Sequence, residues 1–208
     1  MKVEAIEQTR SPQRRLRLRF EDGKSLMVYP AVIAQMGLYV GKELSEAEME
    51  SLRKTCGEVS ARERAVRIIS ASTVSQEELE HRLRQKGEQE EDAQAAVEWL
   101  RELKLLDDRK AAQQIVRSGI VKGYGPARIR QMLYEKRIPK EYWDEALELI
   151  PPQDDAIDTF LQRRFRGRTP DRAECKRAND ALLRRGHSWS DIRKALERYV
   201  PDEEYFED

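Results

Sequence analysis

Basic side chains are concentrated in the stretch GYGPARIRQMLYEKRI, where they surround a tyrosine. The stretch has two main apolar anchors, Ile129 and Leu133. If these turn inward on a helix, the step of about 100° per residue places Arg130, Tyr134 and Arg137 on one flank. Guanidinium groups around an aromatic ring suit a phosphate backbone with stacked bases, or an acidic groove on a protein. These residue types therefore predict recognition of an anionic partner.

Charge is unevenly distributed along the 208 residues, although the formal net charge is zero. Residues 61–108 hold 8 basic and 12 acidic side chains, a net charge of −4, whereas residues 109–152 hold 9 and 5, a net of +4. Residues 160–198 hold 12 and 5, a net of +7, and the acidic segment DEEYFED at 202–208 restores the balance. A polyanionic or acidic partner for the C-terminal two thirds explains this asymmetry. On composition alone, surface charge that serves only solubility explains it equally well.

Residues for catalysis or metal binding are not grouped in the sequence. The histidines, His81 and His187, are expected at surface or capping positions, because they have no cysteine or carboxylate at metal-ligand spacing. The acidic pair Asp107-Asp108 is better explained by the start of a helix than by a metal ion. The tripeptide GKS lacks the upstream glycine of a phosphate-binding loop. We therefore expect neither an enzyme nor a cofactor or metal.

The cellular compartment is expected to be the cytoplasm. The first residues, MKVEAIEQTR, lack the apolar core of a signal peptide, and no apolar run approaches the roughly 20 residues that span a bilayer. Cys56 and Cys175 are far apart and have no CxxC context, which indicates reduced, structural thiols.

The first 58 residues have the pattern of a small α+β segment. In RRLRLRF, apolar residues alternate with arginines at period two, and Asp22-Gly23 is a typical hairpin turn before a second strand in SLMVYP. The pair of strands is expected to pack on the amphipathic pieces PAVIAQMGL and SEAEMESLRKT. The arginine row is either a solvated strand face, which is the default interpretation, or a nucleic-acid contact.

From about residue 60 the apolar spacing is helical, and it repeats. Eight positions recur after 50 residues and again after a further 49. Most of them hold small or apolar residues. In each unit a basic residue stands before the turn that precedes the third helix. In the first unit these positions are Leu79, Leu83, Lys86, Gly87, Ala93, Ala96, Val97 and Leu100; in the second Ile129, Leu133, Lys136, Arg137, Trp143, Ala146, Leu147 and Ile150; in the third Ala178, Leu182, Arg185, Gly186, Ile192, Ala195, Leu196 and Tyr199.

The repeat predicts a mainly α fold of three tandem three-helix repeats, stacked into an elongated, curved solenoid behind the leader with its β-hairpin. The expected domains are the leader at 1–58 and repeats at 59–106, 107–152 and 153–208, the last with the acidic tail. Helix starts are predicted at three places: Ser75 with Glu78 and Ser188 with Asp191 are capping signals, and Pro126 suits a first helical position.

The repeats, the junction sequence LKLLDDRKAAQQIVRSGIVKGYGPARIRQMLYEKRI and the third-unit sequence LLRRGHSWSDIRKAL together resemble the bacterial RecX family. L-L-D-D, G-x-G-P-x-R-I-R-x-x-L and R-R-G-[FH]-S are diagnostic in combination. Two positions depart from the family pattern. His187 stands where an aromatic residue, usually Phe, is common, and Arg137 replaces the glycine that usually ends the middle helix of the second unit.

The resemblance implies a regulator rather than an enzyme. RecX-like proteins lie in the groove of the RecA filament on single-stranded DNA and inhibit strand exchange and ATP hydrolysis. A monomer is expected, with a weak, salt-sensitive contact to single-stranded DNA and no membrane contact. The alternative is a stand-alone DNA-binding protein whose units act as helix-turn-helix readers. The expected partner or DNA surface consists of Arg117, Lys122, Arg128, Arg130, Tyr134, Arg137, Arg163, Arg164, Arg166, Arg168, Lys176, Arg177, Arg184 and Arg185.

Overall fold

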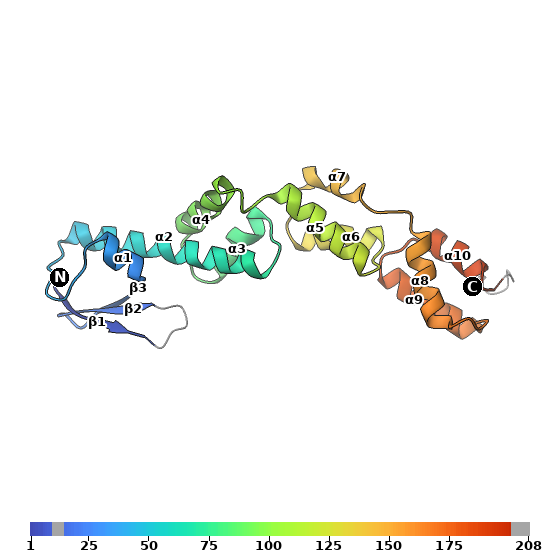
Figure 1. Ribbon diagram of the computed structural model, residues 1–208, viewed down its shortest axis with the longest axis horizontal. Helices are drawn as coiled ribbons and strands as arrows, with labels where there is room; N and C mark the ends of the chain where they lie inside the picture. Colours follow the sequence, from blue (N-terminus) through green and yellow to red (C-terminus); the bar gives the residue numbers. More distant parts are fainter. Residues whose placement is uncertain (10–14, 201–208) are drawn as a thin grey trace. The chain divides into compact units, whose positions relative to one another are not determined.

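The computed structural model describes residues 1–9 and 15–200, so the acidic segment at 202–208 lies outside the described residues (Figure 1). The chain forms two compact units. Unit 1 consists of Met1–Ser72 and Leu79–Leu106, and unit 2 consists of Thr73–Glu78 and the chain from Asp107 onward.

The N-terminal sheet of unit 1 has three antiparallel strands in the order β1 (Val3–Gln8), β2 (Leu16–Phe20) and β3 (Ser25–Val28). The predicted hairpin is confirmed as β2 and β3, in which Leu16 pairs with Val28. The expectation of two strands was incomplete, because β1 adds a third on the other side of β2. A bulge between Val3 and Ala5 shifts the register of β1, and this shift removes the period-two alternation by which a strand is recognised in sequence.

Two helices cover one face of this sheet, α1 (Pro30–Gln35) and α2 (Glu46–Ala71) (Figure 1). Helix α2 starts with a capping box between Ser45 and Glu48, and it runs unbroken across the expected boundary between residues 58 and 59. The other two helices that contribute to this unit are α3 (Gln76–Gln85) and α4 (Glu90–Glu102), of which α4 packs against α2. The shared core of the sheet, α1 and α2 consists of Val3, Leu18, Phe20, Val28, Tyr29, Val32, Leu38, Leu44, Met49, Leu52 and Cys56.

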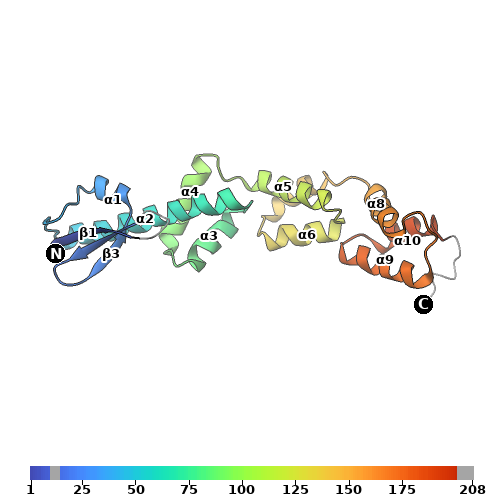
Figure 2. The same ribbon diagram turned by 60° about the horizontal axis from the view of Figure 1, so that its bottom comes forward.

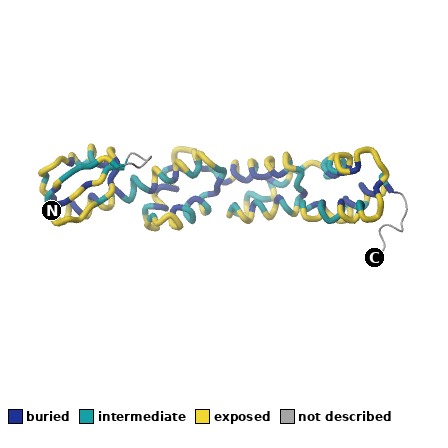
Figure 3. Tube along the Cα trace, turned by 90° about the horizontal axis from the view of Figure 1, so that it is seen from below, coloured by how far each residue is buried: buried dark blue, intermediate teal, exposed yellow. Residues whose placement is uncertain are grey.

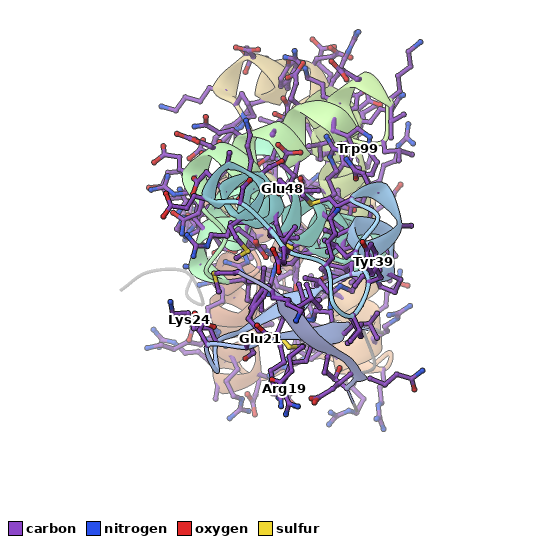
Figure 4. All side chains as sticks on the ribbon, turned by 90° about the vertical axis from the view of Figure 1, so that its left-hand side faces the viewer. Arg19, Glu21, Lys24, Tyr39, Glu48 and Trp99 are labelled. Carbon is purple, nitrogen blue, oxygen red and sulfur yellow. The ribbon has the colours of Figure 1, made fainter. Side chains whose placement is uncertain are left out.

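The arginine row of β2 is partly neutralised within the sheet. Arg19 lies 3.1 Å from a carboxylate oxygen of Glu4 and 3.4 Å from one of Glu7, both on β1. In Figure 4, Arg19 and Glu48 lie on opposite sides of the sheet, so this arginine is on the face away from α2. These contacts agree with the default interpretation of the row as a solvated strand face.

Unit 2 is built from helices in two groups (Figure 2). In the first, α5 packs along α6 and against a short third helix, and in the second, α8, α9 and α10 contact one another. The helices are α5 (Asp108–Val121), α6 (Pro126–Glu135), the 3-10 turn η1 (Lys140–Tyr142), α7 (Trp143–Leu147), α8 (Asp154–Phe165), α9 (Arg172–Arg184) and α10 (Trp189–Glu197).

The repeat is confirmed by burial. All six apolar positions of the first set are buried, as are Ile129, Leu133 and Ala146 in the second and five of the six in the third. Trp143, Leu147, Ile150 and Tyr199 are half-buried and pack against the same clusters. Figure 3 shows buried and exposed stretches alternating along the trace, as amphipathic helices require.

The predicted helix starts are confirmed. Asp107 accepts a hydrogen bond from the backbone N–H of Lys110, so one carboxylate of the acidic pair is an N-cap. The Ser188 and Ser75 side chains cap α10 and α3 in the same way. Pro126 stands in the first turn of α6. Asp171 with Glu174 forms a further capping box at α9, which was not among the predicted helix starts.

Candidate anion-binding cleft

Four of the predicted basic residues line one cleft in unit 2, between the end of α5, the exposed side of α8 and the end of α9. The cleft has a volume of about 500 Å³. Its lining contains no carboxylate among the residues that the structure describes. The four basic residues are Lys122, Arg163, Arg164 and Arg185, and the rest of the lining is Ile120, Val121, Gly123, Ala156, Thr159 and Phe160.

Arg185 is held in place at the back of this cleft. The carbon at the centre of its guanidinium lies 5.2 Å from the centroid of the Phe160 ring, a cation–π distance. One guanidinium nitrogen donates to the carbonyl oxygen of Lys122 at 3.0 Å, at the C-terminal end of α5. A cation fixed by a ring and a helix end loses little side-chain entropy when it binds an anion.

The cleft cations differ from three of the other predicted basic residues in their ion pairing. In residues 1–9 and 15–200, no carboxylate lies within 4.0 Å of Lys122, Arg163, Arg164 or Arg185. In contrast, three other predicted residues are paired: Arg128 with Glu135 at 3.3 Å, Arg137 with Glu77 at 3.1 Å and with Glu78 at 3.2 Å, and Arg168 with Glu174 at 3.4 Å.

The remaining predicted residues are exposed but lie outside the cleft. Tyr134 is 68% exposed and, with Arg137, lines a second hollow of about 460 Å³ whose lining also includes Glu77 and Glu135. The lining of that hollow therefore contains both basic and acidic side chains. The predicted cations that are exposed outside both hollows are Arg117, Arg130, Arg166, Arg168, Lys176, Arg177 and Arg184.

The expectation that Arg137 forms a helical flank with Arg130 and Tyr134 was wrong. Helix α6 ends at Glu135, and Arg137 lies in the following turn with φ of +51°, in the left-handed region. Gly87 and Gly186 occupy the same repeat position with φ of +88° and +85°. The turn is therefore the same in all three repeats, and the two ion pairs of Arg137 help to hold a conformation that glycine adopts without strain.

A backbone joint connects the loop before α6 with the turn between α9 and α10. The Gly125 N–H donates to the carbonyl oxygen of Arg185 at 2.9 Å, and the Ala127 N–H donates to that of Gly186 at 3.1 Å. The backbones approach so closely that a Cβ on Gly125 would lie 2.3 Å from the Gly186 oxygen. The joint fixes the position of Arg185, and hence the back of the cleft.

A side-chain hydrogen bond occupies the equivalent position one repeat earlier. Ser75 stands 50 positions before Gly125, and its hydroxyl donates to the carbonyl oxygen of Lys136 at 2.8 Å. Lys136 is the repeat counterpart of Arg185. Beside this contact, the buried Asp108 carboxylate accepts from the N–H of Gln76 at 2.8 Å. Burial raises the pKa of Asp108, and the bonds from Gln76 oppose that rise.

The expectation that His187 is a surface or capping residue was wrong, because the joint buries it. Its exposed fraction is 4%, and its Nε2 lies 3.2 Å from the carbonyl oxygen of Gly123. Nδ1 is buried with no hydrogen-bond partner in the described part of the chain. Burial lowers the pKa of the imidazole, the Gly123 carbonyl raises it, and the nearby Arg185 charge lowers it further. His187 therefore occupies a core site at neutral pH as a neutral ring.

We expect the free energy of unfolding of unit 2 to fall as the pH falls below about 6.5, the ordinary pKa of histidine. His187 is neutral when folded but takes up a proton when unfolded, so acid favours the unfolded state until the lowered folded pKa is reached. Urea unfolding between pH 7.5 and 5, followed by hydrogen exchange of α9 and α10, measures this loss. The His187→Phe variant should lose less stability over the same range. Parallel pH profiles for the two proteins would assign the dependence to other groups.

Sequence reasoning missed the apolar half of the cleft and the joint. Phe160 is half-buried: it packs against the core cluster of α8, α9 and α10, and the guanidinium of Arg185 lies over its ring. Trp189 is 52% exposed, and the Cζ atom of Arg193 lies 5.3 Å from the centroid of its ring. In the described residues, no group of three or more His, Cys, Asp or Glu side chains is placed to hold a metal ion. A helix long and apolar enough to cross a bilayer is absent from the same residues.

The fold and the cleft define a class of protein: a helical-repeat protein with a basic cleft between two neighbouring three-helix groups, whose cations have no carboxylate partner among the described residues. A family model described as "RecX, second three-helix domain" matches residues 107–147. Regulatory protein RecX of Vibrio parahaemolyticus is 32% identical over 141 residues, which are 66% of this chain and 90% of that protein. Its counterpart in Stenotrophomonas maltophilia R551-3 is 35% identical over 144 residues, which are 68% and 87% of the two chains.

Solved structures agree with this assignment at the level of the fold. A crystal structure of regulatory protein RecX covers 95% of this chain and 98% of its own, with a TM-score of 0.61 and 24% identity. RecX from Lactobacillus salivarius covers 70% and 98%, with a TM-score of 0.57 and 22% identity. The chain belongs to the RecX family of regulatory proteins, as its sequence motifs predicted.

Proposed function

We propose that this protein inhibits the recombinase RecA by binding in the groove of the RecA filament on single-stranded DNA, in the cytoplasm. It thereby suppresses strand exchange and ATP hydrolysis in homologous recombination, DNA repair and the SOS response. Membership of a family of regulatory proteins supports a regulatory role. The observation that carries the proposal is the cleft between α5 and α8, in which four cations lie without a carboxylate partner in the described chain.

The cleft suits an anionic surface for two physical reasons. Its cations make no ion pair with a carboxylate of the described residues, so binding an anion breaks none of the ion pairs in that part of the chain. In addition, Arg185 is held by Phe160 and by the end of α5, which places one guanidinium before the partner arrives. Because the cleft is open to solvent, its attraction for DNA phosphates or acidic side chains is expected to weaken steeply with salt.

The deciding experiment measures ATP hydrolysis by RecA on single-stranded DNA while this protein is added. The proposal predicts inhibition at a salt concentration at which the protein shows no binding to the same DNA alone, measured by fluorescence anisotropy. The alternative, a stand-alone DNA-binding protein, predicts that inhibition and binding to bare DNA disappear together as salt rises. Unchanged ATP hydrolysis at saturating protein would contradict the proposed function.

A further inference from the structure

The basic cleft and the acidic segment at 202–208 have complementary chemistry. The segment DEEYFED carries five carboxylates and two aromatic rings. The cleft offers four unpaired cations beside an apolar edge, where Phe160 is half-buried and Val121 is 87% exposed. Carboxylates suit the guanidinium groups, and the aromatic rings suit the apolar edge.

The chain enters this segment beside α8, one of the helices that line the cleft. Tyr199 packs edge-on against Phe165 with 5.3 Å between ring centroids, and Arg198 pairs with Asp158. Both contacts fasten the end of the described chain to α8, the helix that supplies Arg163 and Arg164 to the cleft. The start of the acidic segment is therefore tied to one side of the helix whose other side lines the cleft.

The distance around α8 is within reach of the segment. A helix with side chains is about 10–12 Å across, so the path to its opposite side is roughly 15–20 Å. Eight residues, 201–208, span up to about 27 Å when extended. The crossing uses about five or six residues, so the segment can still place the carboxylates of Glu207 and Asp208 in the cleft.

We propose that the acidic segment at 202–208 binds in the cleft between α5 and α8 of its own chain and competes there with the anionic partner. The contact is independent of the function proposed above, whereas its regulatory consequence rests on that function. A segment tethered at this distance has an effective concentration on the order of millimolar, so weak intrinsic binding is sufficient to occupy the cleft. A polyanion that makes many contacts displaces the segment.

The test uses the full chain and a fluorescein-labelled peptide, DEEYFED, followed by anisotropy. In one variant the segment is neutralised: Asp202→Asn, Glu203→Gln, Glu204→Gln, Glu207→Gln and Asp208→Asn. This variant should bind the peptide about tenfold more tightly than the wild type does, because the wild-type segment already competes for the cleft. Equal affinity of the two proteins would overturn the proposal.

Further changes in the neutralised background locate the binding site. Arg163→Glu with Arg164→Glu should abolish peptide binding, whereas Lys86→Glu with Lys194→Glu, an equal change of charge on exposed lysines outside the cleft, should preserve it. Peptide binding that survives the cleft reversal would overturn the proposal. A labelled oligothymidylate tests the competing outcome, in which the cleft binds nucleic acid alone. In that case Arg163→Glu with Arg164→Glu abolishes oligothymidylate binding, whereas neutralising the segment changes the affinity neither for the peptide nor for the oligothymidylate. The peptide assay contains no RecA, so its failure is distinguishable from failure of the proposed function.

Discussion

Replacing Gly186 with alanine is expected to destabilise unit 2 by about 2–5 kcal/mol, a large part of the stability of a domain of this size. Gly186 has φ of +85°, and a Cβ there would lie 2.2 Å from the backbone nitrogen of Arg128 and 3.0 Å from its Cα. The left-handed conformation costs a non-glycine residue about 1–2 kcal/mol, and the overlap adds about 1–3 kcal/mol because the atoms in the way are mostly backbone.

The chain contains a matched control for this change. Gly87 has the same repeat position and φ of +88°, but a Cβ there would meet nothing within 4 Å. Gly87→Ala should therefore show the conformational cost alone, about 1–2 kcal/mol, in urea unfolding. Hydrogen exchange should show faster exchange of the Gly125 and Ala127 amides in the Gly186→Ala protein, since the joint uses both. Equal destabilisation by the two substitutions would mean that the joint contributes nothing to unit 2.

The repeat was predictable because it depends on residue types at short spacings along the chain. Leu79, Ile129 and Ala178 are buried at one position, and a basic residue precedes the left-handed turn in each repeat. Such signals depend on neighbours within one or two helical turns, so spacing alone reveals them. The family motifs add the same kind of local information. The positions of the predicted domain boundaries stay a prediction, and α2 crosses the first of them.

The joint and the cleft were not predictable, because they depend on residues far apart in the sequence. The contact of Gly125 with Arg185 and the burial of His187 both result from packing between helix groups about 60 residues apart. Residue type was misleading at His187, since a polar residue beside a turn usually faces water. The role of the basic residues as a partner-binding surface stays a prediction, and ion pairing, which spacing does not reveal, separates Arg163 from Arg168.

Arg137 shows how ion pairs that the sequence does not reveal affect the choice of residues to mutate. Reversing the charges of Arg130 and Arg137 together should change partner binding without unfolding the protein only if both are free surface cations. Arg137 instead pairs with Glu77 and Glu78 in a left-handed turn, so its reversal disturbs the turn as well as the surface charge. Arg130, which is exposed, is suitable for reversal by itself.

Reversing the charges of cleft cations tests the partner-binding surface more directly than reversing Arg130 and Arg137. Arg163→Glu with Arg164→Glu should raise the concentration needed for half-maximal inhibition of RecA ATP hydrolysis by at least about tenfold at low salt, because each reversal replaces an attraction by a repulsion. The slope of log affinity against log salt should also become shallower, by about one for each phosphate that the variant no longer neutralises. Neither arginine pairs with a described carboxylate, so the melting temperature should stay near that of the wild type.

Two exposed lysines outside the cleft provide the control for this double variant. Lys86→Glu with Lys194→Glu alters the net charge equally but lies outside the cleft, so inhibition should change less than about threefold. Equal losses from the two double variants would mean that RecA filaments sense only the overall charge of the protein. A loss confined to the Arg163 and Arg164 variant, with an unchanged melting temperature, would show that the partner enters between α5 and α8, because these two side chains share that cleft with the fixed guanidinium of Arg185.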